Sequence, residues 1–330
     1  MDSDLLSDVL KNVRMSGAIF FDVRASTPWV SEAPAGEVIA PRLMPGAQHL
    51  IEYHVVAQGN CWAALADSRQ EPVRLGPNSI VIFPQGDAHV MSSEPHMRGT
   101  YNMDVYDEPT LERPLPFHLQ LDGGGEECIR VVCGFLGCDS RPFNPLLQSL
   151  PRMVVVEGAA DANDWLGRLI EATVQESHER RIGGSGVLAK LSELIFIEAI
   201  RRFAEAQGDD ARSWLAGLKD PQVGVAIRLM HQDPGYPWSL DELARQVGTS
   251  RTILAERFTE HVGMPPMTYL RNWRMQVAAG MLVGGTHTLI RIATRVGYES
   301  EAAFSRAFKR TTGFSPSGWR ARLQTSVAAG

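Results

Sequence analysis

The sequence lacks the features that direct a chain into or across a membrane. Its longest apolar runs, such as residues 153–156, are far shorter than the roughly 18 residues that a membrane-spanning helix needs. The first ten residues, MDSDLLSDVL, carry acidic side chains where a secretory leader carries basic ones. We therefore expect a cytoplasmic protein that has no membrane partner.

Cysteine is scarce, since 330 residues contain only Cys61, Cys128, Cys133 and Cys138. A chain of this length can bury a sizeable core without disulfides, so the count favours free thiols in a reducing compartment. Cys128, Cys133 and Cys138 raise the alternative of a redox switch, which needs thiols of low pKa. Few basic residues lie near them in the sequence, so we favour structural thiols.

Acidic residues exceed basic ones, giving a net charge of −6, but the two kinds are unevenly distributed. Residues 219–330 contain 14 Lys and Arg against 8 Asp and Glu, whereas residues 1–218 contain 18 against 30. A basic C-terminal part joined to an acidic body indicates a polyanionic partner.

One pattern of residues occurs twice between Trp238 and Trp319. The first copy contains Ser239, Leu240, Leu243, Ala244, Val247, Gly248, Ser250, Leu254, Phe258, Gly263 and Pro266. The second copy contains Thr288, Leu289, Ile292, Ala293, Val296, Gly297, Ser300, Phe304, Phe308, Gly313 and Pro316. The period changes from 49 to 50 because the second copy has one extra residue between Gly297 and Ser300. Such a repeat predicts two copies of one supersecondary unit.

Each copy reads as two short helices joined by a tight turn. Apolar residues at relative positions 0, 3, 4 and 7 form one face of the first helix, and a glycine follows it. A serine then caps the second helix. In the first copy, Ser239 and Glu242 also form a capping-box pattern, with Trp238 and Leu243 placed for a hydrophobic staple. This combination predicts two helix-turn-helix units, at residues 239–262 and 288–312.

A third helix connects the two units. Pro265 and Pro266 start it, Gly284 and Gly285 end it, and its apolar positions are those of a buried face over residues 266–283. At 1.5 Å per residue it spans about 27 Å, close to the roughly 34 Å of one turn of B-DNA. Such a connector would hold two recognition helices in successive major grooves.

The N-terminal half reads as β-rich. Short runs of β-branched, aromatic and aliphatic residues alternate with turn residues, which is typical of an antiparallel barrel or jelly roll. The expected strands lie at residues 18–23, 51–57, 61–65, 79–83 and 129–132. Amphipathic helices follow at 161–177 and 186–206. The second has more apolar surface than one buried stripe requires, so it is either covered on two sides or paired with a second subunit.

A stretch from Gly76 to His89 matches the spacing G-x7-P-x-G-x2-H through Pro84 and Gly86. It resembles the second motif of cupins, although the first gap of that motif is usually shorter. The first cupin motif, H-x-H followed by Glu, is absent, because His49, Glu52 and His54 have the wrong spacing. His49, His54, His89 and His96, with Cys61, are the only candidates for a metal site. They form no compact ligand motif, so we expect neither a metal nor another cofactor.

The C-terminal third combines the doubled unit with three characteristic stretches, Gly297-Tyr-Glu-Ser300, the run from Ala303 to Arg310 and Gly313-Phe-Ser-Pro316. With these features it resembles the AraC/XylS family of transcription regulators. The N-terminal part is similar to the cupin-type sensor of one branch of that family. Its matches are Pro45-Gly46, the stretch from Phe83 to His89, Cys133-Gly134, Asn144-Pro-Leu-Leu and Leu150-Pro151. The resemblance implies a small-molecule sensor, a helical dimer contact and a DNA reader.

The expected fold is therefore an α+β multidomain chain. Residues 1–160 would form a cupin-like β-barrel or jelly-roll sensor, 161–207 a helical dimerisation segment and 208–220 a linker. Residues 221–330 would form an all-α DNA-binding domain with two helix-turn-helix motifs. We expect a sequence-specific transcription regulator rather than an enzyme. Its expected partners are double-stranded DNA, a small effector of unknown identity, a second copy of the chain and, for an activator, RNA polymerase.

Outward positions at the start of a recognition helix contact base edges, while nearby Arg and Lys contact phosphates. The expected DNA-contacting residues are Ser250, Arg251, Thr252, Ala255, Glu256, Ser300, Glu301, Ala302, Ser305, Arg306, Lys309 and Arg310. Arg251 and Arg306 are the best candidates for guanine. For Arg271, Arg274 and Arg291 we expect phosphate contacts or surface ion pairs. The expected effector residues are His49, Tyr53, His54, Trp62, Phe83 and His89, and the expected dimer contacts are Leu188, Leu191 and Ile195.

Two alternatives stay open. A metal-dependent cupin enzyme could be fused to a DNA-binding tail, although the missing H-x-H and Glu pattern argues against it. A sensor domain that binds no ligand and serves only for dimerisation would be the other.

Overall fold

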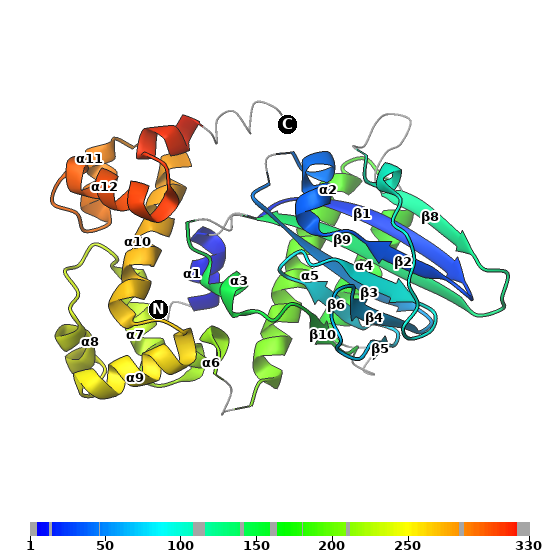
Figure 1. The fold of residues 1–330 in the computed structure, drawn as a ribbon, viewed down its shortest axis with the longest axis horizontal. Helices are drawn as coiled ribbons and strands as arrows, with labels where there is room; N and C mark the ends of the chain where they lie inside the picture. The colour runs from blue at the N-terminus through cyan, green and yellow to red at the C-terminus, as the bar shows by residue number, and fades with distance from the viewer. Residues whose placement is uncertain are drawn as a thin grey trace. The chain divides into compact units, whose positions relative to one another are not determined.

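A computed structural model describes residues 5–12, 15–45, 47–107, 116–138, 142–158, 164–179, 181–208, 212–283 and 287–321. The chain divides into two compact units, whose elements are labelled in Figure 1. The sheet unit comprises Met15–Cys138 and Leu150–Ala206. The helical unit comprises the remaining segments, Met1–Arg14, Asp139–Ser149 and Gln207–Gly330.

The sheet unit contains a six-stranded sheet in the order β10-β6-β3-β9-β1-β8. Its strands are β1 (Met15–Ser26), β3 (His49–Gln58), β6 (Ile80–Phe83), β8 (Phe117–Asp122), β9 (Cys128–Cys138) and β10 (Val154–Val156). All neighbours are antiparallel except β1 and β8. A four-stranded antiparallel sheet has the order β2-β7-β4-β5. Its strands are β2 (Val30–Ala33), β4 (Cys61–Leu65), β5 (Val73–Leu75) and β7 (His89–Ser92).

The core of the sheet unit combines inward side chains of both sheets, including Phe21, Cys61, Val81, Phe83 and Met91. β4 alternates buried and half-buried residues because only one of its faces meets the core. β3, in contrast, is buried on both faces over most of its length. The expected sheet-rich N-terminal fold is confirmed.

Helices cover the second face of β3 and its neighbours. α4 (Trp165–Glu179) and α5 (Gly184–Ala206) pack on each other, and α5 contacts β1, β9 and β10. The hydroxyl of Tyr53 lies 2.6 Å from Ser192 Oγ on α5, in a buried position. Gly134 on β9 leaves room for the Tyr53 ring, since a Cβ there would lie 2.1 Å from Tyr53 Cζ. The first expected helix, at 161–177, starts in residues outside the described ones.

The other helices of the sheet unit are α2 (Gly36–Leu43) and the short 3-10 helix η1 (Met103–Tyr106). The helical unit consists of α1 (Leu5–Asn12), α3 (Pro145–Ser149), α6 (Trp214–Lys219), α7 (Val223–Gln232), α8 (Leu240–Gln246), α9 (Arg251–Val262), α10 (Pro266–Val283), α11 (Leu289–Arg295) and α12 (Glu301–Thr312). The connecting helix α10 has the expected bounds, and the expected stops Gly284 and Gly285 lie outside the described residues.

Two features of the helical unit differ from the sequence expectation. The range 208–220, expected to be a linker, contains α6, whose Trp214 is 2% exposed and donates its indole N–H to Tyr269 Oη at 3.1 Å. An apolar anchor of this size packs like core, whatever the polarity of its neighbours in the sequence. In addition, α1 packs against α7 and α10, and α3 packs against α6. The helical unit is therefore assembled from three separate segments.

Candidate nucleic-acid interface and ligand site

The first helix-turn-helix consists of α8 and α9. Ser239 Oγ accepts the Glu242 backbone N–H at 3.1 Å, and Ser250 Oγ accepts that of Ile253 at 3.3 Å. Gly263 ends α9 at a φ of +76°, the left-handed conformation that glycine adopts most easily. The reciprocal half of the capping box does not form, because the Glu242 carboxylate binds Arg245 and Gln246 instead.

The second helix-turn-helix, α11 and α12, repeats this construction. Thr288 and Ser300 accept backbone N–H groups at 3.4 and 3.2 Å, and Gly313 ends α12 at a φ of +81°. Its longer turn contains Tyr298, whose ring lies 5.9 Å from that of Phe304. The inward residues Leu254, Phe258, Phe304 and Phe308 are fully buried, as their spacing predicts.

The connecting helix anchors both pairs. Tyr269 and Trp273 on α10 are fully or almost fully buried, and Tyr269 lies 5.5 Å from Phe258 of α9. The Arg274 guanidinium donates to the carbonyls of Pro234 at 2.6 Å and Tyr236 at 2.7 Å. These bonds hold the chain before α8 against α10, so Arg274 has a structural role.

The outward side chains of both second helices face solvent. Exposed or partly exposed are Arg251, Thr252, Ala255 and Glu256 of α9, and Glu301, Ala302, Ser305, Arg306, Lys309 and Arg310 of α12. Ser250 and Ser300 use their hydroxyls as helix caps. Ile253, beside Thr252, is 47% exposed and was not among the expected DNA-contacting residues. An exposed apolar side chain at the start of a recognition helix can contact a thymine methyl group.

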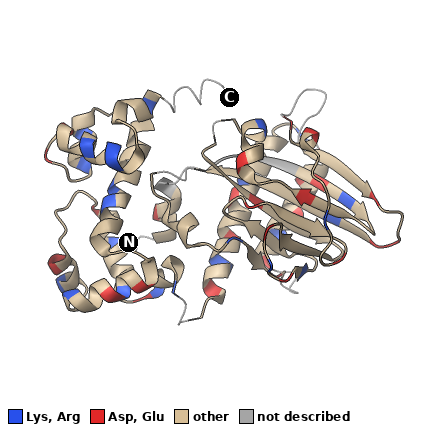
Figure 2. Cartoon of the chain, in the orientation of Figure 1, with Lys and Arg blue, Asp and Glu red and all other residues tan. Residues whose placement is uncertain are grey.

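The second helices of the two helix pairs, α9 and α12, are called the two readers below, and their charges differ. On α9, Arg251 pairs with Asp241 at 3.2 Å, Arg257 pairs with Asp220, and Glu260 pairs with Arg212 at 2.8 Å. On α12, Arg306, Lys309 and Arg310 form no ion pair with any described residue. Figure 2 shows the corresponding contrast: α8 and α9 carry both signs, whereas basic residues dominate α11 and α12. The second reader therefore has more unneutralised positive charge for phosphates.

Three of the six expected effector residues meet in the interior of the sheet unit. His54 Nε2 lies 2.6 Å from His89 Nε2, and the Phe83 ring stacks on that of His89 at 3.8 Å. His54 comes from β3, Phe83 from β6 and His89 from β7, so the cluster joins both sheets. All three side chains are buried.

Glu52 completes this cluster and was missed as a ligand-site residue. It lies two positions before His54 on β3, on the same face, and its Oε2 is 4.0 Å from His89 Nε2. Both of its carboxyl oxygens are buried and have no hydrogen-bond partner among the described residues. The period of two along β3 was the signal that could have linked Glu52 to His54.

Hydrogen bonding defines the tautomers of the two histidines. His89 Nδ1 lies 2.8 Å from the Asp87 carbonyl, which only accepts, so Nδ1 carries the proton and donates it. His89 Nε2 then accepts from the Nε2–H of His54. This leaves His54 Nδ1 as a buried acceptor that no described residue contacts by a hydrogen bond.

Burial keeps the cluster uncharged. It raises the pKa of Glu52 well above its usual value, and the Asp87 carboxylate raises it further. Burial also lowers the pKa of His54, an effect increased by His89, and lowers the pKa of His89 to about 4. Burial thus favours neutral imidazoles and a protonated carboxyl in this interior.

The other three expected effector residues lie elsewhere. His49 Nε2 bonds to the Pro84 carbonyl at 2.6 Å. Tyr53 occupies the opposite face of β3 and bonds to α5. Trp62 alternates with the inward Cys61 and Ala63 and is half-buried on the outer face of the four-stranded sheet. The structure does not bring these three side chains together with His54 and His89.

Comparisons with known proteins give concordant results. Residues 4–205 match a family model described as Cupin, and residues 243–322 match one described as Helix-turn-helix domain. A relative from Streptomyces antibioticus, described as an AraC-like transcription regulator, is 38% identical over 279 residues, which cover 83% of this chain and 88% of the relative. This chain belongs to the AraC-like transcription regulators.

Other relatives of this AraC-like regulator align over nearly its whole length. The RCS-specific HTH-type transcriptional activator RclR of Escherichia coli is 28% identical over 326 residues, covering 97% of this chain and 98% of RclR. Among solved structures, an AraC-type regulator from Chromobacterium violaceum is 27% identical, with a TM-score of 0.30. The match covers 31% of this chain and 92% of the chain in that structure. The protein is accordingly a sequence-specific DNA-binding transcription regulator with a cupin-type N-terminal domain.

The cupin fold of this AraC-like regulator raises the question of a metal. Two nitrogens bound to one tetrahedral zinc at about 2.0–2.1 Å would lie roughly 3.3 Å apart. His54 Nε2 and His89 Nε2 are 2.6 Å apart and bond to each other. Among the residues that the structure describes, no three His, Cys, Asp or Glu side chains are grouped to hold a metal ion. The cluster as arranged does not fit a metal.

Two further findings concern the length and the exposed faces of the helices of this regulator. Within the described ranges, no helix is long and apolar enough to cross a membrane. On α5, Leu188 and Ile195 are 2% and 0% exposed because they pack within the sheet unit, and Leu191 is half-buried. The exposed apolar residues of that helix are Val187 at 48% and Leu194 at 44%.

Proposed function

We propose that this cytoplasmic regulator reads its operator with the outward faces of α9 and α12 and changes its DNA binding when a small effector enters the sheet unit. The observation that carries the DNA part is the doubled, capped helix pair, whose outward residues remain exposed. Recognition helices of this kind contact base edges with residues of their first turns. The protein has no catalytic role in this proposal.

Arg306 is the best test of base reading. It is exposed on α12 and unpaired among the described residues, so Arg306→Ala removes no bond on which the fold depends. A bidentate contact with guanine contributes about 1–3 kcal/mol, so we expect roughly 5- to 150-fold weaker operator binding. Gel-shift titration at fixed salt measures this.

Arg201→Ala is the matched control for that titration. Arg201 is an exposed arginine of α5 that pairs with Glu198. It should leave operator affinity unchanged, and equal affinities for Arg306→Ala and the unchanged protein would refute the assignment of Arg306.

For the effector, we propose a small molecule with an apolar body and one uncharged polar group. The support is the buried cluster of Glu52, His54 and His89, set among Phe83 and Phe135. Within the part of the chain that the structure describes, the Glu52 carboxyl and His54 Nδ1 have no hydrogen-bond partner. A hydroxyl or carbonyl group would satisfy those atoms without burying a charge.

A thermal-shift screen of small alcohols, ketones and aldehydes tests this proposal. A ligand at 100 times its dissociation constant adds about 2.7 kcal/mol of stability. Hits should stabilise the unchanged protein and Trp62→Phe, whose site lies on the outer face, but not Glu52→Leu. Equal stabilisation of all three proteins would place the ligand elsewhere.

The dimer is proposed to use the exposed side of α5. Val187 and Leu194 lie seven positions apart, two helical turns, and so share one face. Leu194→Glu should convert the dimer to monomers in light scattering after gel filtration, whereas the charge reversal Glu171→Lys, at an exposed position of α4, should not. RNA polymerase is the further partner expected of an activator, and transcription in vitro with purified polymerase distinguishes activation from repression.

A further inference from the structure

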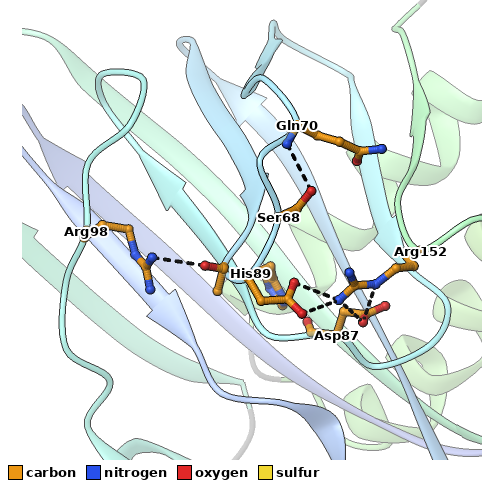
Figure 3. A network of polar contacts seen from close by, with 8 residues as sticks. Ser68, Gln70, Asp87, His89, Arg98 and Arg152 are labelled. Carbon is orange, nitrogen blue, oxygen red and sulfur yellow. Dashed lines mark hydrogen bonds and ion pairs between the residues drawn. The ribbon is translucent and has the colours of Figure 1, made fainter.

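The segment 143–152 passes from the helical unit to the sheet unit, and its second end is fastened beside the buried cluster. Arg152 donates to Asp87 Oδ1 at 2.8 Å through Nε and at 2.6 Å through Nη2, and Nη2 also bonds to Asp67 at 2.8 Å. Figure 3 shows the dashed contacts between Arg152 and Asp87. The Leu150 carbonyl accepts the Gln85 side-chain N–H at 3.2 Å.

Asp87 connects this surface contact with the interior. Its carboxylate binds Arg152, while its backbone carbonyl accepts the Nδ1–H of His89 at 2.8 Å. His89 in turn bonds to His54. A ligand that changes the position or the tautomer of His89 therefore acts on the residue that holds Arg152.

The first end of the segment is seated on the connecting helix. The Phe143 backbone N–H donates to Gln276 Oε1 on α10 at 3.0 Å, and both residues are almost fully buried. The Phe143 ring contacts that of Tyr269 edge-on, with centroids 5.3 Å apart. Asn144 Oδ1 accepts the Leu147 N–H at 3.1 Å and so starts α3. Asn144 and Leu150 are two of the residues that carry the resemblance to the cupin-type sensor.

One side of this segment borders a pocket that is partly open to solvent. The pocket, of about 230 Å³, is lined by Phe143 and Pro145 together with α6 and the last residues of α9. Because no other described element packs closely against this side, the segment can shift on α10 at a smaller cost than an element enclosed in a core.

We propose that residues 143–152 form a strap that couples the His54–His89 cluster to α10. The strap has ten residues, of which five are helical and two, Pro145 and Pro151, are proline, so it has little slack. α10 connects the two helix pairs, so α9 precedes it and α12 follows it in the chain. A shift of α10 at Gln276 therefore changes the spacing between α9 and α12. The strap thus converts the state of the sensor interior into operator affinity.

Hydrogen–deuterium exchange of the full chain tests the strap without an effector or an operator. Arg152→Gln removes the fastening at a side chain that is 46% exposed. We expect roughly fivefold faster exchange in residues 143–149 and around Gln276 of α10, because local protection depends on the contacts that hold a segment in place. The strand β4 should keep its exchange rates.

Arg98→Gln is the matched control. Arg98 is a surface arginine of the same unit, bonded to Glu32 at 2.6 Å and to the Ala66 carbonyl at 3.0 Å, but not to the strap. It should leave residues 143–149 and α10 unchanged. Faster exchange confined to the turn around Asp87 in Arg152→Gln, or equal effects of both variants, would overturn the proposal.

Gln276 provides a second, independent variant. Gln276→Glu keeps an oxygen that can accept the Phe143 N–H, whereas Gln276→Met removes it at similar volume. We expect faster exchange of residues 143–149 in the Met variant and near-normal exchange in the Glu variant. Identical exchange of the strap in both variants would show that this bond does not hold it. These outcomes are separate from the effector proposal, since no ligand is added.

Discussion

Glu52 is fully buried, and its carboxyl oxygens have no hydrogen-bond partner among the described residues. A buried polar group in this condition costs about 1–3 kcal/mol, and the cost is larger for a charge. Protonation of Glu52 limits that cost, which is why burial raises its pKa. Residues that reduce stability in this way tend to lie at functional sites. Glu52 thus supports a ligand site in the interior on physical grounds.

The histidines make stability depend on pH. The pKa of His89 is about 4 in the folded chain and near 6.5 when unfolded, so its contribution is present above pH 6.5 and is lost as the pH falls toward 4. From pH 7 to pH 5 this loss is about 2 kcal/mol. His89→Gln should therefore lose less stability over that interval than the unchanged protein in urea unfolding. Equal losses would contradict the burial of a neutral His89.

The cysteines differ in reactivity. Burial raises the pKa of Cys61 to about 12 and also raises that of Cys133, so neither is a thiolate at neutral pH. Cys128 is exposed. In the native protein, a thiol reagent should modify Cys128 at least tenfold faster than Cys61 or Cys133. Mass spectrometry of the digested peptides measures these rates. Rapid modification of Cys133 would restore the redox-switch alternative.

At the scale of elements, the turns of the two helix pairs are unequal. Gly248 has a φ of +72° and open space around a Cβ position, whereas Gly297 has a φ of +79° and a Cβ position only 2.7 Å from the Gly235 carbonyl oxygen. Alanine at Gly248 should cost about 1–2 kcal/mol through backbone strain alone. Alanine at Gly297 must also displace a backbone contact, so we expect at least twice that loss in urea unfolding. Equal losses would show that the second turn is open.

Sequence patterns predicted the long and well-capped elements. α10 has its expected bounds because prolines start it and apolar residues repeat along it, and the four cap residues of the helix pairs accept the N–H groups that their spacing indicates. Short elements were missed. β5 and β10 have three residues each, and α6 has only six, directly after the polar stretch 207–213. Such elements form through tertiary contacts, which no local pattern records.

The same limit applies to the ligand site. The G-x7-P-x-G-x2-H spacing singled out His89, and His54 was among the histidines considered together with it. Tyr53 and Trp62 were expected at the same site, but each points to another face of its sheet. Aromatic residues on strands do not reveal which face meets the core when both faces of a strand such as β3 are covered.

At the scale of the whole molecule, the two units do not follow the domain order of the sequence. The helical unit takes α1 and the segment 139–149 from the N-terminal half of the chain. β1 begins directly after α1, β9 ends directly before that segment, and Met15 pairs with Cys138 across the two strands. Both connections therefore leave the six-stranded sheet at the same end. Short segments of this kind have no sequence signal for their partners, so the order of predicted elements could not reveal them.

The charge asymmetry between the readers also belongs to the whole molecule. α9 uses its basic residues in ion pairs with α8 and with the chain around Asp220, whereas the basic residues of α12 stay free of ion pairs among the described residues. We infer that both readers contact one operator but that α12 contributes more of the phosphate binding. A salt titration can distinguish the two contributions, because each phosphate contact lowers the logarithm of the affinity by about 0.9 per tenfold rise in salt.

The most direct measurement compares the salt dependence of operator affinity for two double variants. One carries Lys309→Gln and Arg310→Gln on α12. The other carries Arg245→Gln and Arg251→Gln in the first helix pair. Each removes two exposed charges, and both charges of the first pair are engaged in ion pairs with Glu242 and Asp241. We predict that the α12 variant loses about 1.8 units of slope and the other variant less than about half of that. Equal losses of slope in the two variants would contradict the account of two unequal DNA readers.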